Sequence, residues 1–134
     1  SHFFPALIKK IHNAKKNNQK NITIWGNGRA KRELLYVDDF ARACEFFMKK
    51  NIKEHFLNIG SGNEKKIVEY AKYIMKRLKV DLKIKYDLSK PNGVKRKILD
   101  LTIAKKYGWK ATTSLDQAFD LVYENFLTTV KKSN

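Results

Sequence analysis

Three histidines and one cysteine are the residues of this 134-residue sequence that could bind a metal or act as nucleophiles. His12, Cys44 and His55 lie far apart along the chain, and His2 follows its first residue. Zinc sites place their ligands at short, repeated spacings such as Cys-x-x-Cys. No such spacing occurs in the sequence, so it predicts no metal centre. We expect His12 on the exposed side of a helix and His55 in a structural role at the start of a strand.

Tyr86 and Lys90 have the Tyr-x-x-x-Lys spacing of a catalytic pair found in short-chain dehydrogenases. That chemistry requires both side chains on one face of a helix, one turn apart. Here the tyrosine ends an expected strand, and the lysine precedes Pro91 in an expected loop. We therefore interpret this spacing as coincidence.

Two glycine-containing stretches, GNGRAK at 26–31 and GSGNEK at 60–65, are similar to part of a dinucleotide-binding fingerprint. The fingerprint needs a third glycine and a helix that follows directly. Lys31 stands where the third glycine of the first stretch should be, and the second stretch fails in the same way. The sequence therefore predicts glycine turns and no dinucleotide site in either place.

Basic residues flank the first of these turns and a second loop near residue 92, and Trp25 directly precedes the first turn. An indole next to cations can stack on a base while the cations bind phosphate oxygens. A solvated loop is the alternative interpretation. The basic residues concerned are Arg29, Lys31, Arg32, Lys90, Lys95, Arg96 and Lys97.

The charge of the sequence is strongly positive, with 29 Lys and Arg against 13 Asp and Glu and a formal net charge of +16. Three interpretations stay open: a lysine-rich surface, a small ligand that carries phosphate, and a nucleic acid. Lysine outnumbers arginine and is spread along the whole chain. Arginine, with its planar guanidinium, is preferred where a phosphate or a base is recognised, so the pattern favours the first interpretation and disfavours the last.

The composition is that of one folded domain, spanning residues 1–134. Hydrophobic residues make up 43% and aromatic residues 12%, which excludes a disordered chain. The sequence has no run of about 18 apolar residues, so it predicts no membrane span. The single Cys44 excludes an internal disulfide and fits a reducing, cytoplasmic setting.

Periodicity predicts a mixed α/β fold. A polar residue pair at the start of the last helix, Ser114 and Gln117, matches a capping box. The helices are expected at 5–17, 38–50, 66–78, 98–109 and 114–127, and the strands at 21–26, 33–37, 55–60 and 82–87.

Five segments in order resemble the GDP-L-fucose synthases, a branch of the extended short-chain dehydrogenase family. They are SHFFPALIKKIHNAK, ITIWGNGRAKRELLYVDDFARAC, LNIGSG, SKPNGVKRKILD and YGWKATTSLDQAFDLVYENFL. The resemblance covers nearly the whole chain and matches the C-terminal part of the family. It implies a substrate-binding domain without the Rossmann domain that holds the cofactor.

The family epimerises GDP-4-keto-6-deoxy-mannose at two carbons and reduces it with NADPH to GDP-L-fucose. The resemblance implies that His2 is the catalytic acid and a cofactor contact. A histidine suits that role because its pKa lies near neutral pH. We expect the isolated chain to be inactive, since the main NADPH-binding domain is not part of the match.

The family's contacts to the nucleotide sugar fall on Lys10, Trp25, Arg32 and Lys97 of this sequence. Trp25 would lie near the guanosine and the cations near the diphosphate, with Arg32 and Trp25 brought together by adjacent strands. Asn92 stands where the family has an aspartate, so the side chain can still make a polar contact but carries no charge.

Two alternatives remain at this stage. The chain could bind another nucleotide sugar, because related epimerases and reductases share the architecture. A basic nucleic-acid-binding module is the other, and it would need a continuous basic face. A further expectation concerns partners: a homo-oligomer, or association with a cofactor-binding domain, would cover the strand near residues 56–59.

Overall fold

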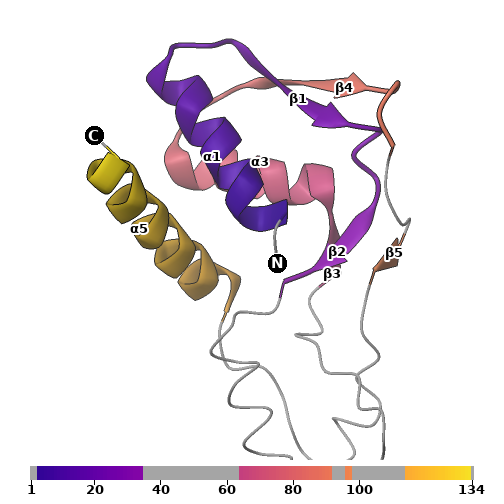
Figure 1. Cartoon of the computed structure of the whole chain (residues 1–134). Helices are drawn as coiled ribbons and strands as arrows, with labels where there is room; N and C mark the ends of the chain where they lie inside the picture. Colours follow the sequence, from indigo (N-terminus) through magenta and orange to yellow (C-terminus); the bar gives the residue numbers. More distant parts are fainter. Residues whose placement is uncertain (1–2, 35–63, 92–95, 98–113, 134) are drawn as a thin grey trace, which may run out of the picture.

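The computed structural model describes residues 3–34, 64–91, 96–97 and 114–133. The expected elements at 38–50, 55–60 and 98–109 lie outside these residues, as do His2, Cys44, His55 and Asn92. The elements are α1 (Phe3–Lys16), β1 (Asn21–Trp25), β2 (Lys31–Glu33), β3 (Glu64–Lys66), α3 (Ile67–Leu78), β4 (Lys83–Asp87), β5 (Arg96–Lys97) and α5 (Leu115–Ser133) (Figure 1).

The strands form two small sheets. In the first, β1 and β4 run parallel, with Ile22 opposite Ile84 and Trp25 opposite Asp87. In the second, β2 lies between β3 and β5, antiparallel to β3 and parallel to β5. The chain passes from one sheet to the other between β1 and β2, and this crossing sets the position of the candidate site.

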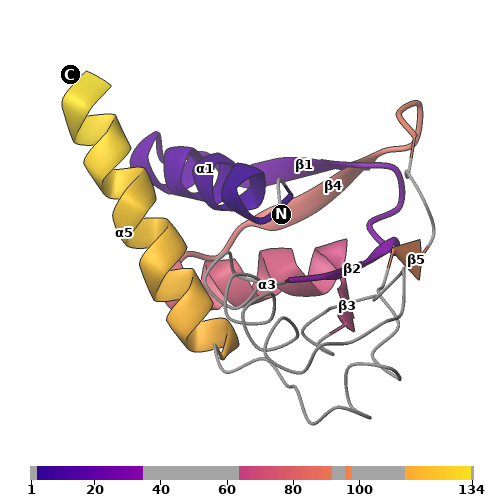
Figure 2. The ribbon, with the colours of Figure 1, turned by 60° about the horizontal axis from the view of Figure 1, so that its bottom comes forward.

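Helices α1 and α3 pack against each other, and the β1–β4 pair lies across them (Figures 1 and 2). Both helices are amphipathic, with apolar residues recurring every three or four positions so that one face is buried. β1 alternates, and it turns Ile22 and Ile24 into the core. The buried residues of the two helices are Phe4, Leu7, Ile8, Ile11 and Ala14 in α1, and Tyr70, Ala71, Ile74, Met75 and Leu78 in α3.

The ends of α3 are held by hydrogen bonds from side chains. At its start the Glu69 carboxylate accepts a bond of 2.8 Å from the Lys66 backbone N–H. At its end the Lys15 ammonium donates a bond of 2.7 Å to the Leu78 carbonyl. A cation there also interacts favourably with the negative end of the helix dipole. Lys15 of α1 therefore joins the two helices.

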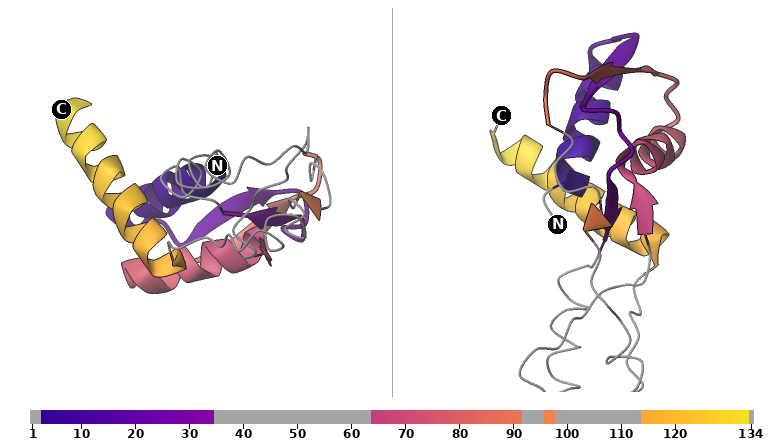
Figure 3. Two further views of the ribbon diagram at one scale, coloured as in Figure 1. Left: turned by 90° about the horizontal axis from the view of Figure 1, so that it is seen from below. Right: turned by 90° about the vertical axis from the view of Figure 1, so that its right-hand side faces the viewer.

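Helix α5 crosses beside α1 and α3 (Figure 3). Its predicted capping box is confirmed: the Ser114 hydroxyl accepts a bond of 3.1 Å from the Gln117 N–H, and Gln117 accepts one of 2.9 Å from the Ser114 N–H. The helix continues to Ser133, six residues beyond the expected end at Leu127. The residues beyond Leu127 include no glycine or proline to end it.

A polar cluster fixes the start of α5 on α3. The Tyr73 hydroxyl donates to the Asp116 carboxylate, and the Arg77 guanidinium bonds Asp116 at 3.0 Å and also pairs with Asp120. Arg77 lies 4.6 Å from the centre of the Phe119 ring. Burial, with the bond to Asp116 adding to it, raises the pKa of Tyr73 to about 12, so this hydroxyl stays a donor at neutral pH.

His12 was expected to be solvated, and the structure corrects this. Its Nδ1 lies 3.0 Å from the Tyr123 hydroxyl, and its ring packs edge-on to Phe126 at 5.0 Å between centres. Both partners lie on α5, more than 100 residues away in sequence, so local periodicity gave no sign of them. Burial lowers the pKa of His12 below 6.5, and the nearby Lys16 and Lys15 lower it further.

The second sheet differs from the expectation because its strands are very short. β2 covers 31–33, where a turn was expected up to residue 32 and a strand from residue 33, β5 covers 96–97 inside an expected loop, and β3 was not predicted. Strands of two or three charged residues have no apolar alternation that could reveal them. An ion pair of 3.4 Å between Lys31 and Glu64 joins β2 to β3.

The turn between β1 and β2 requires glycine at position 28. Gly28 has a φ of 71°, and its carbonyl accepts a bond of 3.0 Å from the Val68 N–H at the start of α3. A Cβ atom added there would lie 2.8 Å from the Tyr86 ring and 3.2 Å from the Val68 Cβ. Both the backbone conformation and the lack of space therefore oppose any side chain.

We expect Gly28→Ala to lower the free energy of unfolding by about 1–3 kcal/mol, because it adds backbone strain and a steric clash. A urea titration monitored by circular dichroism measures this free energy. Tyr86→Ala in the same chain should recover the part that comes from the clash, since the ring is the nearest obstacle. A Gly28→Ala variant as stable as the parent would contradict the prediction.

We expect the free energy of unfolding to fall as the pH is lowered from about 7 to about 5. Unfolded His12, with a pKa near 6.5, binds its proton before folded His12 does, so acid favours the unfolded state. His12→Gln should flatten this pH dependence in urea titrations. The pKa of Asp116 is also lowered, but its carboxylate affects stability only below its ordinary pKa of 3.8, which is outside the pH range from 7 to 5. An unchanged slope in the variant would refute the role of His12.

Candidate functional site

A hollow of about 420 Å³ brings together three of the residues singled out from the sequence, Lys10, Trp25 and Arg32. The remaining lining residues are apolar and come from α1, β1, the start of α3 and the segment after β4. The hollow thus combines an apolar wall with two cations and an indole. The residues not foreseen as part of the site are Phe3, Ala6, Leu7, Ile24, Ile67 and Pro91.

The strands position Trp25 and Arg32 in a way that differs from the expectation. They were expected on adjacent strands, but β1 and β2 belong to different sheets. The turn between them is bonded to the start of α3, through the Gly28 carbonyl to Val68 and the Ala30 carbonyl to the Ile67 N–H at 2.9 Å. This anchoring brings the end of β1 and the middle of β2 to one hollow.

Arg32 is fixed through its backbone. Its carbonyl accepts a hydrogen bond of 3.1 Å from the hydroxyl of Tyr70, whose side chain is buried in the core. Its guanidinium Nη1 donates to the Lys31 carbonyl at 2.8 Å. Arg32 as a whole is half-buried, and these two bonds hold its part of the strand in place.

Trp25 is the last residue of β1 and its side chain is 59% exposed. Alternation along the strand places it opposite to the buried Ile24. The Lys90 ammonium lies over its ring, 5.5 Å from the centre. Such a large exposed indole next to cations suits a ligand with an aromatic base.

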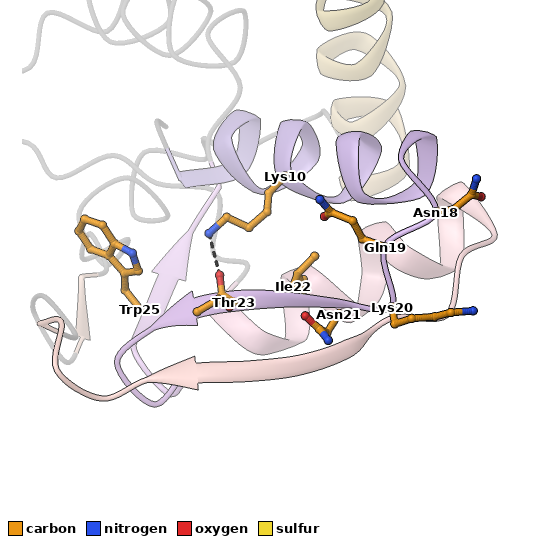
Figure 4. A pocket seen from close by; sticks show the side chains of 8 residues that line it. All are labelled: Lys10, Asn18, Gln19, Lys20, Asn21, Ile22, Thr23 and Trp25. Atoms are coloured by element: carbon orange, nitrogen blue, oxygen red, sulfur yellow. Dashed lines mark hydrogen bonds between the residues drawn. The ribbon is translucent and has the colours of Figure 1, made fainter.

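Lys10 lines both this hollow and a second, open one of about 680 Å³, whose lining residues are drawn in Figure 4. Its ammonium donates a bond of 2.7 Å to the Thr23 carbonyl, so the side chain reaches across to β1. The second hollow was not predicted, because loop amides gave no recognisable pattern. It is lined by Lys10, Asn18, Gln19, Lys20, Asn21, Ile22, Thr23 and Trp25.

Lys97 was expected in the loop near residue 92, and the structure places its backbone in a strand instead. It lies in β5, directly beside β2, with its Cα in register with that of Arg32. His2 and Asn92 are outside the described residues. Their described neighbours in sequence, Phe3 and Pro91, both line the hollow of about 420 Å³.

The described residues contain neither a metal-binding cluster nor a membrane-spanning helix. They contain no group of three or more His, Cys, Asp or Glu side chains that could hold a metal ion. Likewise, no helix in that part of the chain is long and apolar enough to cross a membrane. The arrangement that remains can bind a molecule carrying phosphate groups and an aromatic base.

Comparison with known proteins supports the resemblance. Residues 1–60 match the model of the NAD dependent epimerase/dehydratase family. The chain is 37% identical over 130 residues to "Putative GDP-L-fucose synthase 2" of Arabidopsis thaliana, covering 97% of this chain and 40% of that protein. It is also 37% identical to GDP-L-fucose synthase of Sinorhizobium fredii, with 97% and 41% covered. GDP-L-colitose synthase of Yersinia pseudotuberculosis is 35% identical, with 95% and 42% covered.

Solved structures show the same fold. GDP-mannoheptose C4 reductase from Campylobacter jejuni, with NADP bound, is 26% identical with a TM-score of 0.76, and the match covers 91% of this chain and 43% of that one. A GDP-L-fucose synthetase from Naegleria fowleri bound to NADP has a TM-score of 0.79 at 23% identity, with 98% and 41% covered. The chain thus spans about two fifths of the length of these relatives. In sequence and fold the chain is thus similar to the GDP-L-fucose synthases and, over residues 1–60, to the NAD dependent epimerase/dehydratase family.

Proposed function

We propose that this chain is the C-terminal, substrate-binding part of a GDP-L-fucose synthase and that the hollow of about 420 Å³ holds GDP. The observation that carries the proposal is the meeting of Lys10, Trp25 and Arg32 in one hollow, although they come from a helix and two separate sheets. These are the positions to which the resemblance assigns nucleotide contacts.

Each lining group has a role in this proposal. Arg32 offers a planar guanidinium that can bind two phosphate oxygens at once and stays charged when water is excluded. Lys10 supplies a second cation on a flexible stem, which can leave the Thr23 carbonyl for a phosphate. Trp25 offers an exposed ring face on which a guanine can stack.

The whole reaction is also part of the proposal. The 4-keto group of the bound sugar acidifies the hydrogens on its two neighbouring carbons, so one acid and one base suffice to epimerise them. We assign the acid to His2. Reduction of the ketone then completes the conversion to GDP-L-fucose.

NADPH, which would supply the hydride, does not fit the described residues. A dinucleotide's diphosphate is held where a glycine turn leads into a helix. The Gly26–Gly28 turn leads instead into strand β2. We therefore assign most of the NADPH site to a cofactor-binding domain with which this chain associates, and we expect the 134 residues alone not to oxidise NADPH.

A second candidate is another GDP-sugar reductase. The relative named GDP-L-colitose synthase, at 35% identity, favours it. The described lining residues suit the nucleotide and contain nothing that selects one sugar. GDP binding is therefore common to both candidates, and turnover of the different keto sugars by the complete enzyme would separate them.

We expect Arg32→Ala to weaken GDP binding about tenfold or more, because a hydrogen bond to a charged group contributes about 1.5–3 kcal/mol. Isothermal titration at physiological salt measures this. Lys9→Ala is the matched control, since it removes one positive charge from the exposed face of α1. Lys15 is unsuitable as a control because it holds the end of α3.

Two results would contradict the specific site. Equal losses from Arg32→Ala and Lys9→Ala would mean that only net charge is sensed. Binding of arbitrary duplex DNA in preference to GDP, with a steep dependence on salt, would favour the nucleic-acid interpretation.

A further inference from the structure

The segment that follows β4 begins next to Trp25. The two strands end side by side, with the Trp25 Cα in register with that of Asp87. The Gly26 N–H donates to the Asp87 carbonyl at 2.9 Å, which joins the ends of the two strands. Whatever residue comes next after β4 is therefore held near the indole.

Asp87 then organises a tight turn. Its carbonyl also accepts a bond of 3.2 Å from the Lys90 N–H. Its carboxylate accepts a bond of 3.1 Å from the Ser89 N–H and another from the Ser89 hydroxyl. An aspartate that bonds the backbone two residues ahead fixes a turn in this way. The backbone of Lys90 is thus positioned by the turn, while its side chain remains exposed.

The Lys90 side chain bends back over the indole, with its ammonium 5.5 Å from the ring centre. The next residue, Pro91, lines the hollow together with Lys10, Trp25 and Arg32. None of the described carboxylates forms an ion pair with Lys90. A cation at the edge of the hollow therefore rests on the aromatic surface that a base would use.

Resting on the proposed function, we propose that Lys90 is a diphosphate-binding residue of the GDP site. Its ammonium lies on Trp25 in the empty site and moves to the phosphates when GDP enters, which frees the ring face for the base. An exposed contact between a cation and a ring is weak, whereas an ammonium bond to a diphosphate is charge-assisted. The flexible four-carbon stem of lysine permits the movement.

The proposal makes the phosphates and the base act oppositely on Lys90. The phosphates attract the ammonium, whereas the base competes with it for the ring. Removing the charge while keeping most of the apolar stem, as in Lys90→Met, should therefore weaken GDP binding and leave guanosine binding unchanged or slightly tighter. If Lys90 only supported the turn, Lys90→Met would weaken the binding of GDP and of guanosine alike.

The experiment titrates GDP and guanosine into purified protein that carries the whole of this sequence. Trp109→Phe leaves Trp25 as the sole tryptophan, so its fluorescence reports binding at the ring. We expect Lys90→Met to weaken GDP binding about five- to tenfold, with no loss for guanosine. Lys90→Arg should keep most of the GDP affinity, and Lys9→Met, the matched control on α1, should leave both ligands unaffected.

The possible failures can be told apart. If Arg32→Ala weakens GDP binding but Lys90→Met does not, the role of Lys90 is wrong and the proposed GDP site stands. Equal losses of GDP and guanosine in Lys90→Met would also overturn it, because they indicate a structural role. If the parent protein binds no GDP, the proposed function fails and this inference fails with it.

Discussion

The contacts of one buried tyrosine hold the candidate site to the core. Tyr70 of α3 is 1% exposed, and its ring centre lies 4.9 Å from that of Phe3 and 5.8 Å from that of Phe4 on α1. Its hydroxyl donates to the Arg32 carbonyl on β2. A buried hydroxyl left without a partner costs about 1–3 kcal/mol, so the packing of the two helices also requires β2 to lie where it does. The position of Arg32 therefore follows from the core.

Because the core fixes the strands in this way, a site can form without one continuous sheet. The β1–β4 pair ends at Trp25 and Asp87, and the three-stranded sheet begins beyond the glycine turn. The first sheet buries Ile22 and Ile24 in the core, whereas the second buries little apolar surface, since its strands consist of charged residues. Each is fixed by bonds to the start of α3 or by side chains that enter the helix pair. The hollow lies where these parts meet, so its cations do not place a charge inside the apolar core.

The sequence predicted well those elements whose information is local. Helices α1 and α3 repeat apolar residues with a helical period, and Ser114 with Gln117 marks the start of α5 by a cap whose partners are three residues apart. Trp25 and Arg32 were noticed as an indole and a cation beside a glycine turn, and the resemblance assigned them to the nucleotide. Lys10 was found through the resemblance, and periodicity alone would not have selected it.

The features missed by sequence analysis depend on distant partners. The end of α3 is held by Lys15, 63 residues earlier, and His12 is partly covered by residues of α5. Strands β3 and β5 exist because β2 lies between them, and their own residues have no strand pattern. The apolar wall of the hollow belongs to faces that the helical period describes only as core. Tertiary contacts thus decide what local pattern leaves open.

The net charge of +16 takes on a different meaning once the contacts of the cations are known. Arg77 pairs with two aspartates on α5, Lys31 pairs with Glu64, and Lys15 holds a helix end. These cations serve the fold, and a diffuse positive field from exposed lysines is screened within about 8 Å at physiological salt. Specific affinity for a phosphate must then come from cations that converge on one hollow at short range. Lys10 and Arg32 meet that condition, which is why a small anionic ligand explains the arrangement better than an extended polyanion.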